Sequence, residues 1–177
     1  MTKWLSHRMV ERGIIKEEEQ ELYQFGIRNG MILLLNVVTA LVIGLLTEQL
    51  AVVAEFTLSF MVLRSYTGGY HSDSRIFCYL GSNLVLLVPV YTQAVFYKTS
   101  LARLLAVLLV SAGIIFLLSP MHSKNRKLDK EEQKHFGRKA RLIAALELAV
   151  LGILWHAGQI PYAYAVYTGI CITALFM

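Results

Sequence analysis

The chain has 177 residues, of which 56% are hydrophobic and only 16% are charged, and its mean hydropathy is +0.54. Soluble domains carry about 25% charged residues. The composition therefore excludes a disordered chain, a disulfide-stapled secreted domain and a free nucleic-acid-binding domain. Two stretches without any charged residue, 29–47 and 76–97, have the length of about 20 residues that crosses a bilayer. The sequence predicts an integral membrane protein, in which the net charge of +5 indicates orientation.

The first 28 residues predict a cytoplasmic juxtamembrane segment without a cleaved signal peptide. They contain five basic residues and five glutamates, but no apolar run of the length that a signal peptide requires. Apolar side chains suited to the membrane interface lie among these charges, namely Trp4, Leu5, Met9, Leu22 and Phe25. We expect a partly amphipathic helix over 1–28 and a single polytopic membrane domain over 29–177.

Six apolar segments predict an all-α integral membrane protein with about six transmembrane helices. Their ranges are 29–47, 49–63, 75–97, 102–119, 141–157 and 160–177. The second contains Glu55, and the fifth contains Glu147 and His156, which weakens both as spans because charges in a bilayer are costly. Four spans with two re-entrant or interfacial segments are the alternative.

The distribution of lysine and arginine predicts the orientation of these spans. With six spans, fifteen basic residues fall on the side that holds the N-terminal segment and the loops 64–75 and 120–141. Only Lys98 and Arg103 fall on the other side. Because positively charged loops stay in the cytoplasm, we expect both termini and both of these loops to be cytoplasmic.

The densest polar stretch runs from Arg64 to Cys78. A helix start is expected just before Cys78, because residues that cap helix N-termini precede it, namely Ser72, Asp73 and Ser74. Unpaired N–H groups and the positive end of the helix dipole favour a thiolate at that position. Arg75 adds to this effect if it faces the same side.

His71 is the nearby group that could take up the thiol proton and return it near neutral pH. On one continuous helix, His71 and Cys78 would lie about 10 Å apart along the axis, too far for a hydrogen bond. A catalytic dyad therefore requires a loop that folds back over the helix start, and Gly68 and Gly69 would permit one. The spacing alone leaves open an interfacial histidine and a buried cysteine.

The pattern Arg64-x4-Gly69-x-His71-x6-Cys78 between apolar segments resembles the signature of the accessory gene regulator B (AgrB) family. Ser119-Pro120 followed by a lysine-rich loop supports the resemblance. The resemblance implies a membrane cysteine endopeptidase that processes a quorum-sensing propeptide, with an AgrD-like precursor as its partner.

Under this resemblance, Cys78 would attack a carbonyl of the precursor on the cytoplasmic side, and His71 would act as general base and then as general acid. An internal Cys or Ser of the precursor would attack the resulting thioester and form a thiolactone or lactone. Residues expected to bind substrate or to support the site are Arg64, Gly69, Ser72, Arg75 and Pro120.

These supporting residues also have simpler interpretations. Arg64 could bind a carboxylate of the precursor or anchor its helix at the lipid headgroups, and Pro120 could simply end the fourth apolar segment. Gly69 could be needed only for the backbone conformation that places His71. Ser72 departs from the family pattern after the histidine, which bears on substrate contacts there. No CxxC, HExxH, GxSxG or Walker-type motif occurs in the sequence, so no metal or cofactor is expected.

Two other classes of function stay open. A small transporter or channel would use Glu55, Glu147 and Arg103, and would tolerate Cys78→Ser. A membrane adaptor acylated at Cys78 would carry a hydroxylamine-sensitive fatty acid whether or not His71 is present. Among partners we expect the lipid bilayer and no nucleic acid, and the small size together with the resemblance favours a homodimer.

Overall fold

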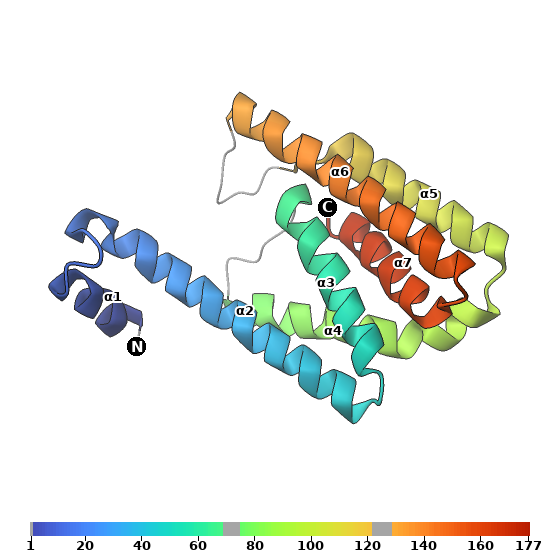
Figure 1. The fold of residues 1–177 in the computed structure, drawn as a ribbon, viewed down its shortest axis with the longest axis horizontal. Coiled ribbons are helices and arrows are strands. Elements are labelled where there is room, and N and C mark those ends of the chain that lie inside the picture. The colour runs from blue at the N-terminus through green and yellow to red at the C-terminus, as the bar shows by residue number, and fades with distance from the viewer. Residues whose placement is uncertain (1, 69–74, 122–128) are drawn as a thin grey trace. The chain divides into compact units, whose positions relative to one another are not determined.

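The computed structural model of the chain describes residues 2–68, 75–121 and 129–177, and within these ranges every regular element is a helix (Figure 1). The helices are α1 (Thr2–Glu11), the short 3-10 helix η1 (Glu17–Glu19), α2 (Gln20–Leu46), α3 (Leu50–Thr67), α4 (Arg75–Lys98), α5 (Leu101–Leu118), α6 (Lys130–His156) and α7 (Ile160–Leu175).

Four helical stretches of the described chain are long and apolar enough to cross a membrane: Glu17–Leu46, Leu50–Thr67, Tyr79–Lys98 and Leu101–Leu118. Large apolar side chains on them face outward, as lipid contact requires; Leu46 is 80% exposed and Leu117 is 82% exposed. These findings confirm an all-α membrane protein. Helix α7 is apolar but has only 16 residues, so the count of six spans stays a prediction.

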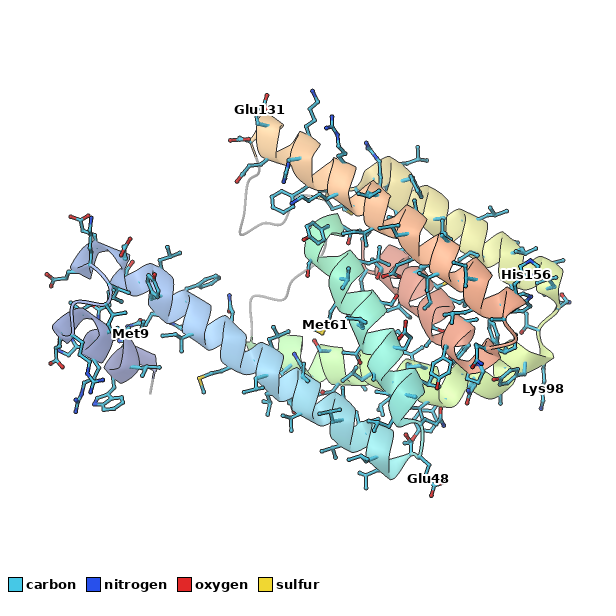
Figure 2. The ribbon with its side chains drawn as sticks, viewed as in Figure 1. Met9, Glu48, Met61, Lys98, Glu131 and His156 are labelled. Atoms are coloured by element: carbon cyan, nitrogen blue, oxygen red, sulfur yellow. The ribbon has the colours of Figure 1, made fainter. Side chains whose placement is uncertain are left out.

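Helix α6 begins at Lys130, well inside the stretch that the charge pattern marks as a loop ending at 141. The reason is a capping box, in which two side chains satisfy the unpaired N–H groups of the first turn. The Asp129 carboxylate accepts from the Glu132 N–H at 2.7 Å, and the Glu132 carboxylate accepts from the Asp129 N–H at 3.4 Å. Figure 2 marks the two ends of α6, at Glu131 and His156.

Residues 1–39 form a compact unit of their own. The fully buried Ser6 of α1 accepts hydrogen bonds from Gln20 and Gln24 at 3.4 and 3.1 Å, which ties α1 to the beginning of α2. Trp4 and Phe25 remain more than 60% exposed, consistent with the interfacial role that the sequence predicts for such side chains.

Residues 40–177 form the second unit, and α7 is its centre. This helix packs against α3, α5, α6 and α4, and Figure 1 shows it between α3 and α6. Small residues permit close approach of the helix backbones: a side chain added at Gly169 would overlap Ser59 of α3. Ser59 also donates a hydrogen bond to Glu147 of α6, so one residue joins α3 to both neighbours.

Tyr164 of α7 connects this centre to α4 at Pro89. A proline inside a helix removes one backbone donor and weakens the helix there. The Tyr164 hydroxyl, on a side chain only 2% exposed, donates to the Pro89 carbonyl at 2.9 Å and lies 2.6 Å from Thr92 Oγ1. The tyrosine ring also packs on Phe96, with 4.9 Å between ring centroids. Helix α4 is thereby fixed to the centre of the unit.

We expect Tyr164→Phe to lower the free energy of unfolding by about 1 kcal/mol, the typical size of an interhelical hydrogen bond in a membrane protein. Tyr162→Phe is the matched control, because Tyr162 lies on the same helix and is 36% exposed. Thermal unfolding in detergent measures both. Equal unfolding temperatures for the two variants would contradict a stabilising bond at Pro89.

Candidate functional site

Helix α4 begins at Arg75, which makes Cys78 its fourth residue. This is the position that the preceding capping residues predict. It closes the first turn, directly after the N–H groups of residues 75–77, which have no acceptor within the helix. Three of the residues expected at the site, Gly69, His71 and Ser72, lie outside the described residues, so the pairing of His71 with Cys78 stays a prediction.

Helix α3 ends at Thr67, and Gly68 follows it in a conformation that other residues avoid, with φ 71° and ψ −150°. Arg64, in the last turn of α3, donates from its guanidinium to the carbonyl oxygen of Gly68 and, at 3.0 Å, to that of Phe176. The guanidinium thus braces the end of α3 against the end of α7. The binding of substrate or of lipid headgroups by Arg64 stays a prediction beside this internal contact.

Gly68 pairs with Met121 in an isolated parallel β-bridge. The Met121 N–H donates to the Thr67 carbonyl at 2.8 Å, and a side chain added at Gly68 would overlap the Met121 backbone. Met121 follows Pro120, which is buried and lies two residues after the end of α5. The structure therefore brings together Arg64 and the Pro120 segment, two candidates that are more than fifty residues apart in sequence.

The basic first turns of α6 also lie beside the end of α3. The Tyr66 ring packs near Phe136, with 6.3 Å between centroids, and Lys139 Nζ lies 5.8 Å from the centre of the Tyr66 ring. Arg141 Nε donates to the Phe116 carbonyl of α5 at 2.9 Å. Two basic residues of the stretch 120–141, Lys139 and Arg141, therefore contact the neighbouring helices α3 and α5.

We call the group formed by Arg64, Thr67, Gly68, Met121 and Phe176 the backbone junction. Nothing in the sequence marks Thr67, Met121 and Phe176, because they contribute main-chain atoms, which every residue type carries. Arg64 and Gly68 have a signal in the sequence, as the first residue of the motif and as half of a glycine pair between apolar segments. The junction holds the point at which the chain leaves α3 toward position 71.

The fold and this arrangement define the class: an all-α membrane protein with a cysteine in the first turn of α4 and a backbone junction at the end of α3. The family model for accessory gene regulator B, AgrB, matches residues 1–177, and the chain belongs to this family. Membership links it to the processing of quorum-sensing peptides, with a propeptide as the general class of substrate.

Two AgrB-like proteins of Clostridium perfringens are similar to the chain. The one from strain SM101 is 23% identical over 148 residues, which cover 80% of this chain and 69% of the relative. AgrB-like protein 2 from strain 13 is 25% identical over 134 residues, which cover 71% of this chain and 61% of that relative. The match thus spans about two thirds of the length of these relatives. No solved structure matches.

We expect Gly68→Ala to lower the free energy of unfolding by about 1–3 kcal/mol, the cost of holding a side chain in so rarely populated a backbone conformation. Gly81→Ala in α4 is the control, because no atom lies within 4 Å of the added methyl group and alanine favours the helix. Thermal unfolding in detergent compares the two. A Gly68→Ala variant as stable as Gly81→Ala would show that the bridge to Met121 is not as described.

Proposed function

We propose that the protein is a membrane-embedded cysteine endopeptidase that cleaves a quorum-sensing propeptide and promotes its cyclisation. The observation that carries the proposal is the position of Cys78 in the first turn of α4, within a chain of the AgrB family that has His71 seven residues earlier. Helix N-termini favour thiolates, because their N–H groups and dipole stabilise negative charge.

The proposed reaction has two steps at one sulfur atom. In the first, the Cys78 thiolate attacks the scissile carbonyl carbon, and His71 protonates the departing amine as the C–N bond breaks. The N-terminal fragment then remains attached to Cys78 as a thioester. In the second step, an internal thiol or hydroxyl of that fragment loses its proton to His71 and attacks the thioester, which releases a thiolactone or lactone and restores the thiolate.

The first turn of α4 also suits the negative charge that forms on the carbonyl oxygen in each step. The N–H groups of a first helical turn have no intrahelical acceptors. They can therefore donate to an oxyanion held next to the thiolate. The same end of the helix would thus stabilise both the nucleophile and the intermediate, which supports Cys78 as the reacting group.

The short connection from α3 to α4 supports a role for His71. Six residues separate Gly68 from Arg75, and His71 is the third of them. A residue spans at most about 3.6 Å, so the His71 Cα lies within about 11 Å of the Gly68 Cα. In this proposal, Arg64 acts as a positioning residue, because its guanidinium binds the Gly68 carbonyl from which this connection starts.

We also propose that the site lies on the cytoplasmic side of the cell membrane, because the basic residues predict that orientation. An AgrD-like precursor would meet the enzyme there, and the homodimer remains part of the same proposal. The transporter alternative has less support, since Glu147 receives a hydrogen bond from Ser59 and a packing role between α3 and α6 accounts for its place in an apolar helix.

The rate at which iodoacetamide alkylates Cys78, measured against pH in the purified protein, tests the dyad without a substrate. We expect Cys78 to react well below pH 8, and His71→Gln to lower its rate at pH 7 by about tenfold, because only the thiolate reacts. Cys171, a partly buried free cysteine on α7, is the internal control.

Mass spectrometry of the two cysteine-containing peptides reports each rate separately. A Cys78 as inert as Cys171, or one whose profile ignores His71, would contradict the proposed dyad.

A further inference from the structure

The Ser119–Met121 segment, which the backbone junction holds from one side, meets α6 on another. Gly137 of α6 is buried, and a methyl group added to it would lie 3.0 Å from Pro120 Cδ and 3.2 Å from the Ser119 carbonyl oxygen. Both distances are shorter than ordinary van der Waals contact. The missing side chain at position 137 therefore lets the segment lie directly against α6.

The position of this segment determines which contacts Met121 can make with the end of α3. Its N–H reaches the Thr67 carbonyl at 2.8 Å, and it pairs with Gly68 across the bridge. Moving Pro120 away from α6 would move Met121, because a trans peptide unit fixes the spacing of adjacent Cα atoms at about 3.8 Å. A side chain at 137 would therefore disturb the end of α3 through two intervening contacts.

The contact of Gly137 lies apart from the apolar cores of the unit. The buried members that α6 contributes to the cores are Ala144 and Leu151, both further along the helix. Gly137 instead touches backbone and proline atoms next to the backbone junction. Its neighbours on α6 also meet the end of α3, through the contacts of Phe136 and Lys139 with Tyr66.

We propose that Gly137 is a positioning residue of the peptide-processing site, whose lack of a side chain seats Pro120 against α6 and thereby sets where the chain leaves α3 toward His71. The inference rests on the proposed function of His71 and Cys78. It assigns a role in that site to α6, which lies outside the motif between Arg64 and Cys78.

Two matched series test the role of Gly137. Gly137→Ala and Gly137→Val add one and three carbon atoms next to Pro120. Gly152→Ala and Gly152→Val add the same atoms to the same helix, where nothing lies within 4 Å. The readout is the pH profile of Cys78 alkylation by iodoacetamide in the full-length protein, with thermal unfolding measured in parallel and His71→Gln as the reference.

We expect Gly137→Val to move the Cys78 profile toward that of His71→Gln, with a loss in rate at pH 7 on the order of tenfold, because small displacements of paired groups have large effects on reactivity. Gly137→Ala should fall between this variant and the natural protein. Both Gly152 variants should keep the natural profile. Gly137→Ala adds the smaller group and keeps the test valid if the valine variant does not fold.

The possible outcomes separate the two proposals. If the natural profile depends on His71 but the Gly137 variants keep it, Gly137 only packs, and the inference is overturned while the proposed function stands. A lower unfolding temperature with an unchanged profile has the same meaning. If the natural profile does not depend on His71, the dyad itself fails, and the positioning role fails with it.

Discussion

One backbone hydrogen bond, from the Met121 N–H to the Thr67 carbonyl, joins the end of α3 to the chain that follows α5. It can form because Gly68 adopts a backbone conformation that other residues avoid and lies so close to the Met121 backbone that a side chain would not fit. Arg64 then fixes the Gly68 carbonyl and the end of α7 together. The proposed chemistry depends on this junction, because the connection that carries His71 starts from it.

The helical core keeps the two ends of that connection in place. Ser59 joins α3 to α6 and approaches α7 closely, and Tyr164 joins α7 to α4 at Pro89. Helix α7 contacts both α3 and α4. It therefore supports the two helices that this connection joins. Such a fixed support would favour the proposed cyclisation, because it depends on the geometry of the reacting groups.

Sequence patterns could predict the parts of this structure that depend on residue type. Hydropathy indicated an all-α membrane protein, and the capping residues before Arg75 placed Cys78 near a helix start. The charge pattern marks 120–141 as a connection between apolar segments but does not report its secondary structure, and the capping box of Asp129 and Glu132 begins α6 within it, at Lys130.

The backbone junction could not be predicted in the same way. Met121 and Phe176 contribute a main-chain N–H and a carbonyl, and Gly137, outside the junction, contributes only the space that its missing side chain leaves, so none of them has a distinctive pattern. Their contacts also join residues far apart in the chain, which periodicity does not report. The family match explains why a processing site is expected, whereas the junction describes how this chain would support one.

The central claim is that the connection after Gly68 folds back so that His71 meets Cys78. A His71→Cys, Cys171→Ser variant tests it, because mild oxidation in membranes joins positions 71 and 78 only when their Cα atoms approach within about 7 Å. Trypsin cleaves after Arg75, so the linked pair appears as two joined peptides by mass spectrometry. Ser65→Cys in the same background, on the exposed face of α3, is the control. We predict rapid linkage from position 71 and little from position 65, whereas equal rates from both, or no linkage from position 71, would contradict a folded-back loop.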